Sequence, residues 1–76
     1  MQITVKYFAS LREQMGREGD VLDIEKPLLM TEVWQQVSDD KPLDNLLCSR
    51  NRQYAQWDEL TEDGDEIAFF PPVTGG

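Results

Sequence analysis

The chemistry that this chain could perform is concentrated in its last eight residues, FFPPVTGG, which end in a free carboxylate. Pro71 and Pro72 favour extended backbone, so the first part of this segment is predicted to be stiff. Gly75 and Gly76 have no side chains and allow close approach to another backbone. Fully extended, residues 71–76 span up to roughly 20 Å, at about 3.3–3.6 Å per residue. We interpret them as an arm that delivers the Gly76 carboxylate into a channel of another protein.

A frayed chain end without function is the alternative interpretation of this segment, because the ends of most domains are poorly ordered. The arm hypothesis is favoured by the apolar strand pattern EIAFF immediately before Pro71, which we expect at the centre of a sheet. A central strand would fix the point from which the arm starts.

The rest of the chain contains few groups suited to catalysis. It has no histidine, which excludes a Ser/His/Asp triad and histidine metal ligands. Cys48 is the single cysteine and follows Leu46 and Leu47, so we interpret it as a small buried hydrophobic residue. The sequence DGDE at 63–66 lacks the spacing of a calcium loop and is interpreted as a polar turn. We expect no metal or cofactor site in this chain.

The charge balance indicates the kind of partner. Fifteen acidic and seven basic residues give a net charge of -8, which disfavours nucleic acid and anionic membranes. A basic protein surface is the natural complement, although the charge could serve solubility alone. Arg50 and Arg52 are interpreted as solvated cations, and Asp39, Asp40 and Asp44 as polar residues at a helix end. One cysteine, no apolar leader and no bilayer-length segment together predict a cytoplasmic protein.

Alternating apolar and polar residues predict two strands in the first part of the chain, at 1–8 and within 18–27, where Pro27 ends the second. The apolar residues expected to share the inner face are Ile3, Val5, Tyr7, Leu22 and Ile24.

Two helices are predicted from capping signals and helical spacing. A short one covers 9–15, with Ser10 and Glu13 in capping-box spacing and Gly16 at its end. The main helix lies within 28–42, with Thr31 as the candidate N-cap. The apolar stripe of this helix consists of Val33, Trp34 and Val37, and we expect it in the core. Trp57, later in the chain, is also expected in the core.

The last third of the chain has a less regular pattern. Leu43, Leu46 and Leu47 are interpreted as a helical turn, and one or two short strands are expected within 49–57. Gly64 is expected in a turn that requires positive φ. The final strand covers 66–70, with Ile67 and Phe69 on one face and Ala68 and Phe70 on the other.

This order of elements predicts an α+β fold, a roll in which a mixed sheet packs against one main helix. A ubiquitin-like β-grasp fits the order, with the first and last strands adjacent at the sheet centre. The expected organisation is a β-grasp domain at 1–70 and an extended tail at 71–76.

The stretches ITVKYFASLREQMG, at 3–16, and DGDEIAFFPPVTGG, at 63–76, resemble the sulfur-carrier small subunit of molybdopterin synthase, a ubiquitin-like β-grasp family. Asn51 lies where that family often has an asparagine. The chain length and the diglycine end also fit, so the resemblance spans the whole chain and is densest at its two ends.

The resemblance implies a carrier cycle. An adenylyltransferase related to ubiquitin-activating enzymes would use ATP to convert Gly76 to an acyl-adenylate, and a sulfur donor would then leave a thiocarboxylate. The chain would dock on the large catalytic subunit of the synthase, in a heterotetramer, and pass sulfur to a cyclic pterin phosphate precursor to build the molybdopterin dithiolene. The catalytic groups would belong to the large subunit, so this chain would be a non-catalytic sulfur donor.

The resemblance also implies roles for single residues. Gly76 would be the reactive end, Gly75 would keep the tip thin, and Phe70 would be an exposed apolar anchor, unless a second layer covers its face of the sheet. The remaining residues of the arm would contact the partner's channel; they are Pro71, Pro72, Val73 and Thr74. Three alternatives stay open: a sulfur carrier for thiamine or another product, a ubiquitin-like modifier joined to target lysines, and an interaction module with an inert tail.

Overall fold

The computed structural model describes residues 1–42 and 44–72 of the chain. Seven elements follow one another in it, and five of them are strands. They are β1 (Gln2–Tyr7), α1 (Ala9–Met15), β2 (Gly19–Asp23), α2 (Met30–Ser38), β3 (Leu47–Arg50), β4 (Gln53–Ala55) and β5 (Glu66–Phe70).

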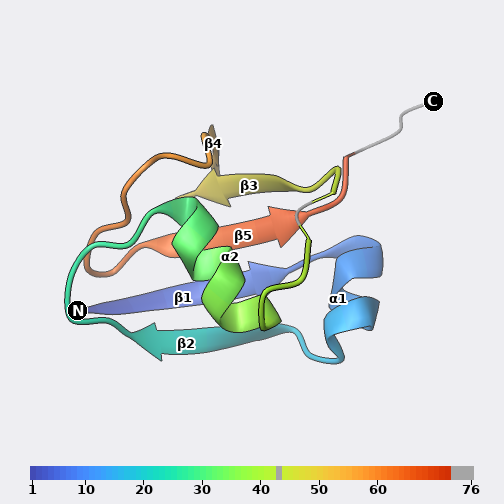
Figure 1. The fold of residues 1–76 in the computed structure, drawn as a ribbon, viewed down its shortest axis with the longest axis horizontal. Coiled ribbons are helices and arrows are strands. Elements are labelled where there is room, and N and C mark those ends of the chain that lie inside the picture. The colour runs from blue at the N-terminus through green and yellow to red at the C-terminus, as the bar shows by residue number, and fades with distance from the viewer. Residues whose placement is uncertain (43, 73–76) are drawn as a thin grey trace.

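The strands form one mixed sheet with the order β2-β1-β5-β3-β4 (Figure 1). β1 and β5 run parallel at its centre, with Val5 opposite Ile67, and the other neighbours are antiparallel. The expectation that the first and last strands pair at the centre of an α+β roll is therefore confirmed. Because β5 is hydrogen-bonded to strands on both sides, these neighbours hold its backbone in place up to its last residue, Phe70.

The helix α2 packs across one face of this sheet (Figure 1). Its predicted stripe is confirmed, since Val33, Trp34 and Val37 are all buried. The Trp34 ring meets Phe69 edge-on at a centroid distance of 5.2 Å, and its indole N–H donates to the Lys41 carbonyl at 2.8 Å. Trp57 stacks on Phe69 at 5.6 Å, as expected for a core residue. This polar and aromatic packing fixes the helix against the centre of the sheet.

Both predicted helices exist and Gly16 is confirmed as the C-cap of α1, but the predicted N-terminal caps are wrong. α1 covers the expected residues and ends at Gly16, with φ 73, yet its N-cap is Phe8 and has no side-chain cap bond. Ser10 lies inside this helix, so Ser10 and Glu13 do not form a capping box. Ala9, the first helical residue, has φ 56, which only glycine adopts without strain.

α2 begins at Met30, one residue before the predicted cap Thr31. The reason lies in a distant loop. The backbone N–H groups of Met30 and Thr31 donate to the carbonyls of Glu59 and Trp57, at 2.9 and 3.1 Å. These long-range acceptors satisfy two free N–H groups at the helix start, and the Glu32 carboxylate accepts from the Leu29 N–H at 2.8 Å, so no hydroxyl cap is required.

Two boundaries in the sheet also differ from the predictions. Leu47 begins β3 instead of continuing a helical turn, and Leu43 lies outside the described residues. β2 ends at Asp23, well before Pro27, although Ile24 is buried as expected. The buried position of Cys48 and the positive φ of Gly64, 85°, are both confirmed.

Candidate functional site

The predicted arm starts at the end of the central strand β5. Phe70 is the last residue of β5, Pro71 is half-buried and Pro72 is exposed. This end of the sheet is the one beside α1 (Figure 1). The remaining site residues expected from the sequence, Val73, Thr74, Gly75 and Gly76, lie outside the described residues.

Strand alternation places Phe70 on the face of the sheet that neither helix covers. Ile67 and Phe69 point into the core under α2, while Ala68 and Phe70 point the other way, as predicted. Phe70 is half-buried, because neighbouring side chains of this face contact it and no second layer covers it.

Three apolar residues beside Phe70 extend it into a surface, which we call the apolar patch: Phe8, Leu47, Tyr54 and Phe70. Leu47 lies directly opposite Phe70 in the register of β3 and β5, and the Tyr54 ring is 5.9 Å from the Phe70 ring. The Phe8 N–H donates to the Phe69 carbonyl at 3.2 Å, which continues the central pairing. Phe8 is 47% exposed, Leu47 36% and Tyr54 75%. Contiguous exposed apolar groups of this kind mark interaction surfaces.

Sequence reasoning found only Phe70 among these four residues. The sequence pattern around Leu47 predicts a helical turn. Tyr54 lies in a strand of only three residues, which is too short to show an alternating pattern. Phe8 comes directly after β1, and the alternation of that strand predicts that Phe8 points to the open face. This alternation was the one sequence signal for its position.

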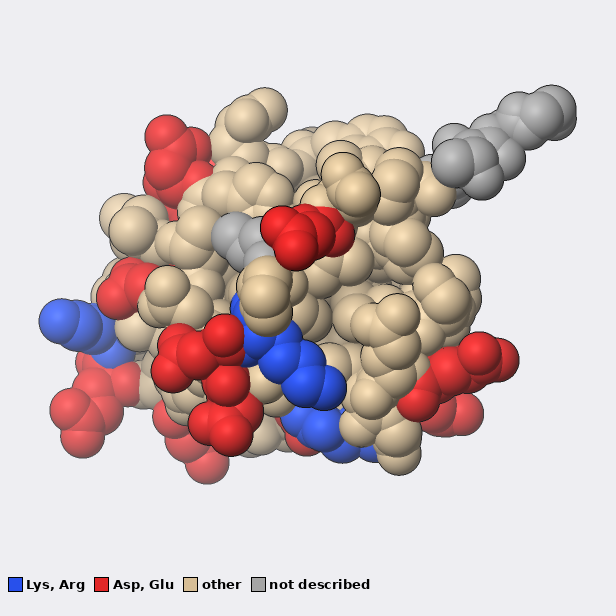
Figure 2. Space-filling model, turned by 45° about the vertical axis from the view of Figure 1, so that its right-hand side comes forward, with Lys and Arg blue, Asp and Glu red and all other residues tan. Residues whose placement is uncertain are grey.

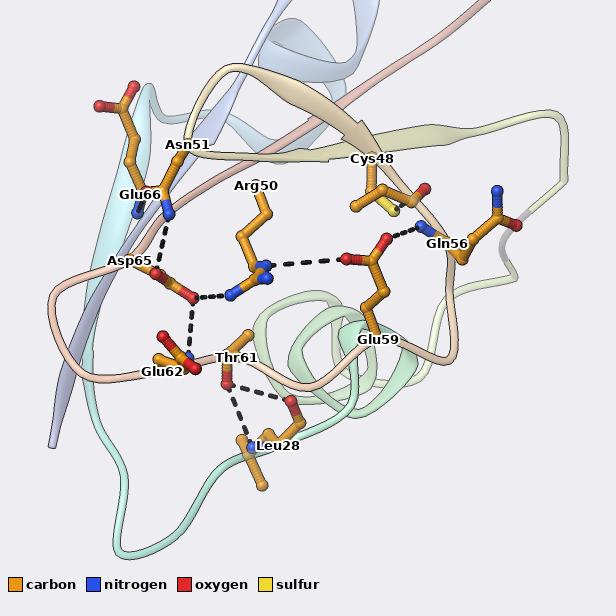
Figure 3. Close-up of polar contacts among 11 residues, drawn as sticks. Leu28, Cys48, Arg50, Asn51, Gln56, Glu59, Thr61, Glu62, Asp65 and Glu66 are labelled. Atoms are coloured by element: carbon orange, nitrogen blue, oxygen red, sulfur yellow. Dashed lines mark hydrogen bonds and ion pairs between the residues drawn. The ribbon is translucent and has the colours of Figure 1, made fainter.

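A polar cluster around the buried Asp65 carboxylate fixes the opposite end of β5 (Figure 3). The Asp65 carboxylate, 6% exposed, accepts hydrogen bonds from the Arg50 guanidinium at 3.1 Å, the Asn51 amide at 2.9 Å and the Glu62 N–H at 2.7 Å. Burial alone would raise the pKa of Asp65, but these three donors outweigh it and hold the pKa below its usual value. The cluster ties the turn between β3 and β4 to the start of β5.

Arg50 and Asn51 are structural members of this cluster. Arg50 forms ion pairs with Asp65, at 3.1 Å, and with Glu59, at 3.8 Å, so its interpretation as a merely solvated cation is wrong. Asn51 has φ 54 and accepts from the Glu66 N–H at 2.9 Å while it donates to Asp65. Asparagine tolerates this left-handed conformation better than most residues, which accounts for its presence here.

Cys48 is not available as a nucleophile in this fold. Its side chain is buried, and burial, with the nearby Glu59 charge, raises the pKa of the thiol to about 11. A thiol with such a pKa is almost wholly protonated at neutral pH. In residues 1–42 and 44–72, no group of three or more His, Cys, Asp or Glu side chains is arranged to hold a metal ion.

Charged side chains are distributed over the surface of the described residues (Figure 2). Acidic side chains are spread over the face shown in Figure 2, with a smaller group of basic ones among them. On the open sheet face Lys6 pairs with Glu66 at 3.4 Å. Neither helix of the described ranges is long and apolar enough to cross a membrane. The described residues therefore offer a binding surface and the start of an arm.

These features define a class of protein: a β-grasp domain whose central, C-terminal strand leads into a proline-containing arm. The ThiS family matches residues 5–76, and the chain belongs to that family. The molybdopterin synthase sulfur carrier subunit of Escherichia coli (strain K12) is 32% identical, over 97% of this chain and 99% of that protein.

Solved structures agree on the fold. Small archaeal modifier protein 1 of Haloferax volcanii has a TM-score of 0.78 at 26% identity, over 95% of this chain and 98% of that one. A chain from the protein–protein complex of subunits 1 and 2 of the Helicobacter pylori molybdopterin-converting factor has a TM-score of 0.68 at 20% identity, over all of both chains. The fold is a ubiquitin-like β-grasp.

Proposed function

We propose that this chain is a sulfur carrier and the small subunit of a molybdopterin synthase. The observation that carries the proposal is the match to the Escherichia coli sulfur carrier subunit over nearly the full length of both chains. The fold supports it, because β5 is held on both sides and presents Phe70, Pro71 and Pro72 at one end of the sheet.

The proposed chemistry starts at the Gly76 carboxylate. A carboxylate is a poor electrophile, because its charge is delocalised and oxide is a poor leaving group. An adenylyltransferase partner would join it to AMP from ATP, with release of pyrophosphate. A sulfur nucleophile would then attack the acyl carbon and displace AMP, which leaves a C-terminal thiocarboxylate. The thiocarboxylate sulfur would form a new C–S bond with the cyclic pterin phosphate precursor in place of an oxygen substituent, which leaves. Water would then cleave the acyl C–S bond and regenerate the Gly76 carboxylate, and two such transfers supply the two sulfurs of the dithiolene.

The division of work between the subunits follows from the side chains of this one. It has no histidine, and its cysteine is buried and protonated. General acids, bases and phosphate-binding cations would therefore come from the large subunit. The apolar patch would dock on that subunit and place the arm in its active site, with Phe70 as the anchor at the start of the arm.

Mass spectrometry of the intact protein tests the carrier chemistry. The chain would be incubated with its candidate adenylyltransferase, ATP and a sulfide source, beside a variant that lacks Gly76. We expect a mass gain equal to the replacement of one oxygen by sulfur in the wild type alone. No gain, with an adenylyltransferase shown to be active on a known substrate, would refute the proposal for that pair.

A modifier function is the second candidate, and one observation favours it: the similarity to small archaeal modifier protein 1. The same activated Gly76 could acylate a lysine amine of a target protein. Adducts of higher mass in cell extracts, lost in the Gly76 deletion, would indicate this function. A sulfur carrier for thiamine or another product would share the mass gain, but it would not bind a molybdopterin synthase large subunit.

A further inference from the structure

Arg52 occupies a position where the backbone disfavours an arginine. Asn51 and Arg52 are the two central residues of the β3–β4 hairpin, and both have positive φ, 54° and 69°. This is the geometry of a type I′ turn, and glycine is strongly preferred at its second position. A long cationic side chain at this position therefore carries a conformational cost that a function could explain.

The surroundings of Arg52 form a small built pocket. Tyr54 lies opposite Ser49 in the β3–β4 register, on the open sheet face, and Ser49, Arg52, Tyr54 and Phe70 line a depression of ≈ 270 Å³. Tyr54 and Phe70 give the depression aromatic walls, and Ser49 contributes a hydroxyl group. Arg52 is exposed, and it forms no ion pair with any residue of 1–42 or 44–72.

The chemistry of this pocket selects a carboxylate. A guanidinium presents a planar fork of N–H donors that matches the two oxygens of an aspartate or glutamate. The Ser49 hydroxyl could donate a further hydrogen bond, and the two rings could pack on the methylene groups of the same side chain. The chain carries a net charge of -8, so basic side chains such as Arg52 are in the minority on its surface. An acidic side chain could form a local ion pair here and would be repelled over most of the remaining surface.

We propose that Arg52, Ser49, Tyr54 and Phe70 form a specificity pocket for an aspartate or glutamate side chain of the large subunit of the synthase. This inference rests on the proposed function. The pocket is continuous with the apolar patch through Tyr54 and Phe70, so a partner that covers the patch also reaches Arg52. The apolar patch would contribute burial, and the carboxylate would fix the orientation of the docked subunit, because a rotated partner would leave Arg52 unpaired.

The test compares the affinity of the large subunit for the wild-type chain and for charge variants, by titration calorimetry. R52E reverses the charge inside the pocket. K26E makes the same change in net charge on the exposed loop after β2, the strand at the opposite edge of the sheet from β4 (Figure 1). We expect R52E to lose about tenfold or more in affinity and K26E to lose less than about threefold. Equal losses in the two variants would overturn the proposal, since only long-range charge would then be acting.

A third variant guards against misfolding, and a charge swap identifies the partner group. Glycine is the preferred residue at this turn position, so R52G should raise the melting temperature by a few °C. The same variant should still weaken binding by about tenfold, because it lacks the guanidinium. Reversal of one aspartate or glutamate of the large subunit to lysine should restore the affinity of R52E and weaken that of the wild type. If no such reversal does so, the carboxylate assignment is wrong. If the wild type does not bind the large subunit at all, the proposed function fails and this inference with it.

Discussion

Asp65→Asn should destabilise the protein far more than its small change in shape suggests. The carboxylate accepts three hydrogen bonds, from Arg50 and the Glu62 N–H on one oxygen and from Asn51 on the other. The amide of the variant has an oxygen on one side only. If that oxygen faces Arg50, the NH₂ group of the new asparagine faces the Asn51 NH₂ group, and two donors meet. Asn51 cannot rotate its amide to avoid this, because the Asn51 oxygen accepts a hydrogen bond from the Glu66 N–H.

The magnitude follows from these contacts. The bonds from Arg50 and from the Glu62 N–H then go to a neutral oxygen, at about 1 kcal/mol each, and the amide of the exposed Asn51 loses its acceptor, at about 1 kcal/mol. We expect a loss of about 3 kcal/mol in the free energy of unfolding at pH 7, which lowers the melting temperature of a domain of this size by about 10–20 °C. Thermal unfolding followed by circular dichroism measures this loss, and Asp58→Asn, a change at an exposed residue, is the matched control.

The pH dependence identifies the cause. Because the pKa of Asp65 is lowered in the folded state, its stabilisation is fully present above the ordinary aspartate pKa, about 4, and is lost as the pH falls through the folded value. The difference between wild type and Asp65→Asn should therefore be constant from pH 7 down to about pH 5 and shrink below that. A loss under about 1 kcal/mol at pH 7, or a difference that does not change in acid, would refute the reasoning.

Three further predictions concern single positions. Ala9→Gly should raise the free energy of unfolding by about 0.5–1 kcal/mol, because Ala9 has φ 56; an unchanged denaturant midpoint would contradict this. Cys48 should react with iodoacetamide at pH 8 at least about a hundredfold more slowly in the folded protein than in urea, because its thiol is buried with a pKa of about 11, and rapid labelling of the native protein would refute it. Gly75→Val should abolish the mass gain from sulfur transfer at an unchanged melting temperature, and efficient thiocarboxylate formation by this variant would show that the tip need not be narrow.

The parts of the fold that could be predicted are those with a strong contrast between faces. Ile3, Val5 and Tyr7 alternate with polar residues, and Val33, Trp34 and Val37 repeat at helical spacing, so burial alone determined their orientation. The cap of α2 could not be found in this way, because its acceptors come from Trp57 and Glu59, far along the chain.

The same distinction applies to the candidate site. Its arm is a local feature of composition, expected from prolines followed by glycines, and the structure describes only its first two residues, Pro71 and Pro72. The apolar patch depends on the pairing of Leu47 with Phe70 and on a hairpin that places Tyr54 beside them. The pattern around Leu47 fits a helical turn as well as a strand, and only the sheet register decides between them. The role of Arg50 was missed for a similar reason, since its partner Asp65 lies fifteen residues away.

The central position of β5 has a consequence for folding. The parallel pair that joins Val5 to Ile67 brings together distant parts of the chain, and such non-local pairing is slow compared with helix or hairpin formation. A chain whose synthesis stops before β5 would leave two facing edges, on β1 and β3, without their hydrogen-bond partners, and bare edges promote aggregation. Incomplete chains should therefore aggregate, and without Phe70 they cannot form the complete apolar patch. The complete sheet can form only in molecules that have been translated at least to the end of β5, where the arm begins.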